Sequence, residues 1–130
     1  MIEDFLGPAE FRQGLHNFLV KHKYQTAVTK DLMNELSAAV SSEHLDVEQI
    51  VDTWTRQKGY PVLTLSKDPS NGDYHIRQDR FFADSSAESG QDIPSHFNYK
   101  WEVPVTYISS DKPSVQHKIW FNRTMDKLTV

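Results

Sequence analysis

Cysteine is absent from these 130 residues, which excludes disulfide frameworks, thiol nucleophiles and cysteine-based zinc sites. Long apolar runs are absent too. No stretch approaches the roughly 18–20 consecutive apolar residues of a membrane-spanning helix, so we expect no direct membrane insertion of this segment. With only five glycines, the sequence also lacks a glycine-rich loop of the kind that cradles phosphate groups.

The sequence has no concentration of charge of one sign. Its fourteen basic residues are scattered among eighteen acidic ones, and the formal net charge is −4. Nucleic-acid binding needs clustered Lys and Arg, so we expect no nucleic-acid partner. What the sequence does have is a hydrophobic content of 38%, which is enough to build the core of one domain or of two small ones.

The first part of the chain, up to about Lys58, has apolar residues at helical spacing. Thr29 is expected to cap one of the helices. Asp46, with Gln49 three residues later, forms the pattern of a capping box and predicts the start of the last helix. Gly59 is expected to end that helix as the C′ residue.

After Pro61 the period changes to that of strands. The segments "PVLTLS", "YHIRQDRFF", "YKWEVPVTYISS" and "VQHKIWFN" predict four strands, with "KLTV" as the start of a fifth, and "DPSNGD", "DKPS" and the polar loop 83–96 separate them. This segregated order predicts an α+β fold: a helical segment, 1–59, followed by an antiparallel β-sandwich-like module, 60–130. Gly59, Tyr60 and Pro61 are expected to form a structural hinge between the two.

Six histidines raise the possibility of a metal site, for which the best cluster is Glu43, His44 and Glu48. An Asp46 cap places His44 before the helix, and no third ligand is near, so solvated loop residues are the favoured interpretation. Neither H-E-x-x-H nor G-x-S-x-G occurs. We therefore expect no catalytic and no metal-binding residues. Asn122 begins an N-R-T sequon and is a glycosylation candidate if the protein passes through the secretory pathway.

Three motifs stand out along the chain: T-W-T-x-Q-x-G-Y-P-V at 53–62, which is the most specific, Q-x-R-F at 78–81 and W-x-V-P-V at 101–105. With further segments in the same order along nearly the whole chain, they resemble the zinc metallo-aminopeptidases, the gluzincin family of aminopeptidase N and glutamyl aminopeptidase. The resemblance implies an internal fragment. Its residues 1–59 would be the C-terminal end of a thermolysin-like catalytic domain, and 60–130 most of the following β-sandwich domain, truncated at its C-terminal end.

The resemblance also implies a function for the parent protein, a zinc-dependent hydrolase that removes N-terminal amino acids from peptides. In that family the zinc ligands and the catalytic residues precede the segment that corresponds to this chain, so none is carried onto it. The chain would then be an inactive structural segment that binds no zinc, within an extracellular or lumenal ectodomain of a membrane-anchored protein. The alternative is a β-module that acts as a protein-binding or dimerisation surface without an enzymatic role.

Self-association of the isolated chain is expected as well. Three short helices and a small sandwich offer little cover for the eight large apolar side chains of the helical half, which are Phe5, Leu6, Phe11, Leu15, Phe18, Leu32, Met33 and Leu36.

Overall fold

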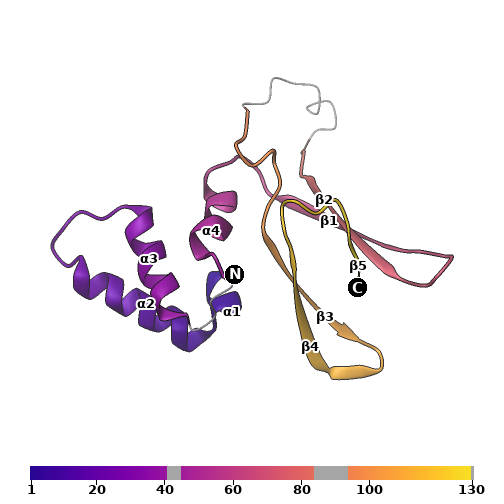
Figure 1. The fold of residues 1–130 in the computed structure, drawn as a ribbon, viewed down its shortest axis with the longest axis horizontal. Helices are drawn as coiled ribbons and strands as arrows, with labels where there is room; N and C mark the ends of the chain where they lie inside the picture. The colour runs from indigo at the N-terminus through magenta and orange to yellow at the C-terminus, as the bar shows by residue number, and fades with distance from the viewer. Residues whose placement is uncertain (41–44, 84–93, 130) are drawn as a thin grey trace. The chain divides into compact units, whose positions relative to one another are not determined.

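The computed structural model describes residues 1–40, 45–83 and 94–129. The chain forms two compact units, Met1–Val51 and Asp52–Val130. In the described residues every helix precedes every strand, and all strand pairs are antiparallel (Figure 1). The predicted α+β class is therefore confirmed.

The helical unit contains α1 (Ile2–Leu6), α2 (Pro8–Lys21), α3 (Thr29–Ala39) and the first part of α4 (Val47–Thr55). Gly7, at a φ of 99°, separates α1 from α2, and Pro8 occupies the first turn of α2, where its missing N–H costs nothing. Helices α2 and α3 approach closely at Gly14, where an added Cβ would lie 2.8 Å from a methyl carbon of Leu36. Only glycine fits at that contact without movement of its neighbour.

The helix ends agree with the sequence at one of three predicted positions. Asp46 caps α4 as predicted, because its Oδ1 accepts the N–H of Gln49 at 2.9 Å. The assignment of Thr29 as a cap is wrong: Val28 occupies that position, and its N–H donates to the Asp31 carboxylate at 2.9 Å. The assignment of Gly59 as the residue that closes α4 is also wrong, because the helix ends at Thr55.

The eight apolar side chains expected to be left uncovered are mostly covered. Four are buried and four are half-buried, so the surface proposed for self-association does not consist of these residues. The large apolar side chains that remain well exposed on α2 are Leu19 and Val20, at 64% and 60%. Self-association itself stays a prediction.

The second unit contains five strands in two sheets. One sheet has the order β1-β2-β5, from β1 (Pro61–Lys67), β2 (Tyr74–Arg80) and β5 (Leu128–Thr129), and β3 (Val103–Ser109) pairs with β4 (Lys112–Phe121) in the other (Figure 1). The prediction that "DKPS" separates the last two long strands is wrong for most of its length. Lys112 already pairs with Ser109, so the ladder extends almost to the turn.

The core of this unit draws on both sheets. Its buried residues are Ile76 on β2, Trp101 just before β3, Val103 on β3 and Phe121 on β4. Trp54, from the last turn of α4, packs against this cluster and is partly buried. The two largest members, Trp101 and Phe121, are fully buried. Phe121, at the end of β4, pairs with Val103, at the start of β3.

Candidate functional site, a buried polar junction

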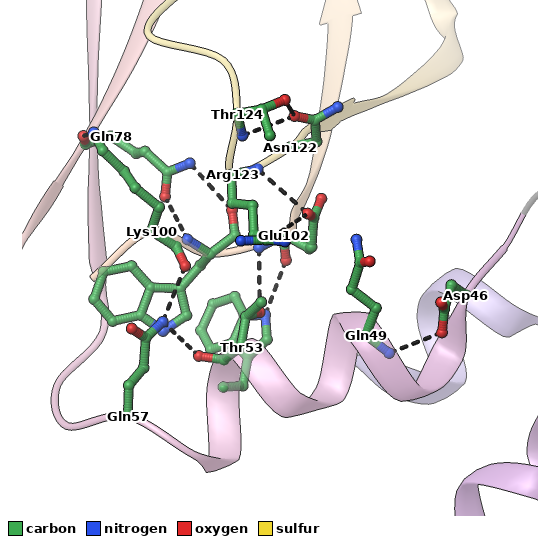
Figure 2. A network of polar contacts seen from close by, with 12 residues as sticks. Asp46, Gln49, Thr53, Gln57, Gln78, Lys100, Glu102, Asn122, Arg123 and Thr124 are labelled. Atoms are coloured by element: carbon green, nitrogen blue, oxygen red, sulfur yellow. Dashed lines mark hydrogen bonds and ion pairs between the residues drawn. The ribbon is translucent and has the colours of Figure 1, made fainter. Parts of the chain in front are cut away.

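Three segments that are far apart in the sequence meet beside the core of the second unit (Figure 2). They are the segments 53–62, 78–81 and 101–105, which also carry the family resemblance. We call the resulting network the junction and define it by eight residues: Thr53, Trp54, Gln57, Gln78, Lys100, Trp101, Glu102 and Arg123.

Gln78 joins the two sheets at the junction. Its side-chain Nε2 donates to the carbonyl of Trp101 at 3.1 Å, and the N–H of Trp101 donates to its Oε1 at 3.0 Å. The side chain thus reproduces the pair of bonds that a neighbouring strand would make. Glutamine and asparagine are the side chains that offer a donor and an acceptor on one planar amide. Gln78 is 1% exposed, so the two bonds are shielded from water.

Gln57 holds the end of α4. Its Nε2 donates to the carbonyl of Thr53 at 2.7 Å and to that of Lys100 at 3.0 Å (Figure 2). The hydroxyl of Ser95 donates to the Gln57 Oε1 at 2.7 Å. The last carbonyls of a helix have no partner within the helix. A side chain satisfies one of them here, which explains why α4 ends at Thr55 without a glycine in the C′ position.

Two consecutive residues of α4 bind the backbone of Glu102. Its N–H donates to the hydroxyl oxygen of Thr53 at 3.2 Å, and its carbonyl accepts from the indole N–H of Trp54 at 2.9 Å. Thr53 and Glu102 are both buried. Unpaired backbone groups in such a place would each cost about 1–3 kcal/mol, so these bonds fix where the last turn of α4 meets the start of β3.

The charged groups of the junction are partnered. The Glu102 side chain is 7% exposed; its Oε1 accepts the backbone N–H of Arg123 at 3.4 Å and lies 3.9 Å from the Arg123 Nε. A buried carboxylate requires such partners, because a lone charge in the interior is expensive. Close by, the guanidinium of Arg80 lies over the ring of Tyr99 at 3.9 Å, a cation–π contact.

The predicted hinge lies at the edge of this region. Gly59 has a φ of 86°, a backbone conformation that favours glycine. The N–H of Phe81 donates to the carbonyl of Tyr60 at 2.9 Å, and the two rings stack with centroids 4.8 Å apart. Pro61 then begins β1 opposite Arg80. The segment is thus bonded to the end of β2, and its role as a hinge stays a prediction.

Asn122 follows directly after β4 and is half-buried. Its Oδ1 accepts the N–H and the hydroxyl of Thr124 at 2.9 and 2.6 Å (Figure 2). This Asx-turn engages the carbonyl side of the amide and no hydrogen of its nitrogen, the atom that a glycan would modify. Glycosylation of Asn122 remains a prediction.

The candidate metal cluster falls largely outside the described residues, which include neither Glu43 nor His44. Glu48 forms an ion pair with Lys30 at 3.4 Å. In the part of the chain that the structure describes, no group of three or more His, Asp or Glu side chains is placed to hold a metal ion. Of the polar loop 83–96, residues 84–93 are likewise outside the described ranges.

The sequence pattern alone indicates that Gln78 points inward and needs a hydrogen-bond partner, although our prediction of the site did not include it. Gln78 follows Ile76 by two residues, so both point to the same face of the strand, and Ile76 is in the core. A polar residue in an inward phase needs a hydrogen-bond partner. No comparable signal existed for the contact between Glu102 and Arg123, which lie 21 residues apart.

Comparison with known proteins connects these segments to a family. Residues 1–54 match the Peptidase family M1 domain. Glutamyl aminopeptidase of Mus musculus is 36% identical over 115 residues, which are 88% of this chain and 11% of that protein. The chain is thus similar to M1 peptidases over its first 54 residues and to a glutamyl aminopeptidase over most of its length. The resemblance inferred from the sequence is thereby confirmed.

Other relatives also match along most of the chain. Glutamyl aminopeptidase of Homo sapiens is 36% identical over 124 residues, 95% of this chain and 12% of that protein. The human thyrotropin-releasing hormone-degrading ectoenzyme is 32% identical over 125 residues, 92% of this chain and 12% of the relative. The chain therefore spans about one eighth or less of the length of these relatives. Among its described residues, no helix has the length and apolar character to cross a membrane.

Proposed function

We propose that this chain is a non-catalytic structural segment of a zinc-dependent aminopeptidase that removes N-terminal amino acids from peptides. The observation that carries the proposal is the junction. In it, the side chains of Thr53, Trp54, Gln57 and Gln78, from two of the family segments, are bonded to backbone groups. Two of the relatives are named aminopeptidases. Zinc and the peptide substrate belong to the larger protein in this proposal, and this chain supplies none of their ligands.

The domain assignment that accompanies this function is also proposed. Residues 1–59 would be the C-terminal end of the catalytic domain, and 60–130 the β-sandwich domain that follows. In support, the match to the M1 domain stops at residue 54, one residue before α4 ends at Thr55. The strands all lie beyond that match.

The proposed role of such a segment is to fix the relative positions of its helices and strands. The junction fixes the last turn of α4 against the start of β3 through Gln57, Thr53 and Trp54. Catalytic geometry is sensitive to small displacements, and a misplacement of about 1 Å that originates far from the reacting atoms can reduce a rate about a hundredfold. A segment that keeps its elements in register therefore supports catalysis without taking part in it.

The cellular setting proposed for the parent is extracellular or lumenal, in the ectodomain of a membrane-anchored protein. One relative is named an ectoenzyme, and glycosylation of Asn122 would fit the same setting. Both statements concern the parent protein and are tested in the secretory pathway of a eukaryotic host.

The direct test of the non-catalytic role uses the purified chain. We expect no stoichiometric zinc by elemental analysis and no hydrolysis of aminoacyl arylamides. One equivalent of tightly bound zinc, together with activity that is lost on chelation and restored by zinc, would contradict the proposal.

A second candidate function is dimerisation through the β-module, which an open cleft favours. The cleft has a volume of about 670 Å³. It is lined by Leu63 and Leu65 of β1, Tyr74 and Ile76 of β2, residues 105–109 of β3 and Ser110 directly after that strand. Among the described strands, β3 pairs only with β4, so its other edge is open. The occupant we propose is the β3 edge of a second copy, because an open edge can pair with itself in antiparallel fashion.

Light scattering over a concentration series tests this second function. The variant Ile108→Lys places a charge at the open edge of β3, where the side chain is 63% exposed. It should abolish a dimer formed through the cleft, whereas Leu19→Ser with Val20→Ser should abolish one formed through α2. A monomer in the wild-type chain at high concentration would contradict both modes of association.

A further inference from the structure

The sheet β1-β2-β5 has an outer face of unusual composition. Ile76 points into the core, so its neighbours on β2, His75 and Arg77, point to the opposite face. In the register of the sheet Arg77 pairs with Thr64 and His75 pairs with Ser66. His75 also pairs with Thr129 of β5. Basic side chains and hydroxyls therefore lie side by side on this face.

These side chains surround a hollow of about 280 Å³. Its lining consists of Thr64, Ser66, His75, Arg77 and Lys127. Two of the five are permanent cations at neutral pH, two are hydroxyls, and none is acidic or apolar. The hollow thus presents several hydrogen-bond donors and positive charge to one small volume.

Two of these groups have donors available. The Arg77 Nε lies 2.9 Å from a carboxylate oxygen of Asp79, and the contact leaves the two terminal nitrogens of the guanidinium for another acceptor. Lys127 forms no ion pair among the residues that the structure describes. Both side chains are solvent-exposed, so they can adjust to a ligand.

His75 forms a fixed wall of the hollow. Its Nδ1 lies 3.2 Å from the Thr129 hydroxyl oxygen, and its Nε2 lies 3.5 Å from a carboxylate oxygen of Asp68. Both ring nitrogens are thus engaged, and the imidazole side chain is only 14% exposed. The binding groups are therefore the arginine, the lysine and the two hydroxyls.

We propose that this hollow binds a tetrahedral oxyanion, phosphate or sulfate, either free or as an ester on a sugar. The forked guanidinium of Arg77 suits two oxygens of such a group, and Lys127 adds a point charge. Thr64 donates from the adjacent strand. The Ser66 hydroxyl donates to the carbonyl of His75 at 3.5 Å, so it must turn from that carbonyl to donate to the ligand. Asp79 competes with the ligand for Arg77, so the bound state requires that the guanidinium turn at least partly from the carboxylate. This site is independent of the structural role proposed above.

The test is a titration of the isotope-labelled full chain with inorganic phosphate and with sulfate, at low ionic strength and neutral pH, followed by NMR. Shifts should concentrate on residues around the hollow. Arg77→Gln should weaken binding about tenfold, as the loss of one charge-assisted contact predicts. Arg12→Gln, at an exposed position of α2, is the matched control and should bind like the wild type.

A second pair of variants distinguishes the effect of a charge beside the hollow from the effect of the net charge of the chain on anion affinity. Asp79→Asn should tighten binding because it releases Arg77, whereas Asp111→Asn, in the turn after β3, changes the net charge equally and should leave the affinity unchanged. A sulfated disaccharide that binds more tightly than inorganic sulfate would identify a sugar-borne group as the ligand, and equal affinity would identify the free anion. Absence of binding, or equal weakening by Arg77→Gln and Arg12→Gln, would overturn the proposal.

Discussion

The most informative perturbation of the junction is Gln78→Met. Methionine has nearly the length and volume of glutamine but neither a donor nor a strong acceptor. The change leaves the N–H and the carbonyl of Trp101 without their partner, at distances of 3.0 and 3.1 Å in the wild type. Trp101 is fully buried and Gln78 is 1% exposed, so water does not readily replace the lost bonds.

The size of the effect follows from the two backbone groups of Trp101 that lose their hydrogen-bond partners. Each buried backbone group that loses its partner costs about 1–3 kcal/mol, and the added apolar surface of methionine returns part of that. We expect a loss of about 2–4 kcal/mol in the free energy of unfolding of the second unit. For a domain of 60–100 residues each kcal/mol corresponds to about 4–8 °C in melting temperature.

The assay can observe the second unit by itself. All three tryptophans, Trp54, Trp101 and Trp120, lie within Asp52–Val130, so tryptophan fluorescence during urea unfolding reports that unit. Gln116→Met, at an exposed position of β4, is the matched control and should change the stability by less than about 0.5 kcal/mol. If Gln78→Met is as stable as this control, the bonds to Trp101 do not hold the sheets together and the reasoning is refuted.

Three further predictions concern positions outside the buried network. Gly59→Val should destabilise the second unit by roughly 1–2 kcal/mol, because the φ of Gly59 is 86° and the new Cβ would lie 3.2 Å from the Arg80 Nε. Gly59→Asn should destabilise it less, and equal melting temperatures of the two variants would remove the hinge argument. Asn122 should carry a glycan when the chain is secreted from a eukaryotic host, and mass spectrometry should find that glycan in the wild type but not in Thr124→Val, which lacks the sequon. Equal masses at Asn122 in the two proteins would mean that the residue is inaccessible or the compartment is wrong. The hydroxyl and the N–H of Ser70 donate to the Asp68 carboxylate and lower its pKa from 3.8, so this group stabilises the fold above about pH 3.8 and loses that effect as the pH falls through the lower folded value. NMR titration should show a higher pKa for Asp68 in Ser70→Ala, and an unchanged pKa would count against the assignment.

Those features of the fold that depend on neighbouring residues were predictable from the sequence. The strand β1 follows from a β-branched run after Pro61, and the start of α4 follows from Asp46 and Gln49, whose contact spans three residues. The end of α4 was not predictable in this way. A local rule assigned it to Gly59, whereas the helix ends where Gln57 binds the carbonyl of Lys100, 43 residues away in the chain.

The junction shows the same limit at the level of the site. The sequence identified the segments 53–62, 78–81 and 101–105 through their resemblance to a family, and the structure shows that they contact one another. Nothing in a single sequence tells which residue Gln78 will bond, because its partner is 23 residues away. Resemblance therefore located the components of the site, and only the fold showed that they form one network.

The central claim is that this chain supports an aminopeptidase without contributing to its chemistry. A chimera tests it most directly: the 115 residues of mouse glutamyl aminopeptidase that match this chain are replaced by the matching residues of this chain, and the rate of aminopeptidase turnover and the zinc content are measured. We expect a folded, zinc-loaded chimera whose kcat lies within a few-fold of that of the mouse enzyme, and a kcat that falls when Gln78→Met is added. A chimera that folds and holds zinc but does not turn over substrate would contradict the claim, since residues of this segment would then be required for catalysis.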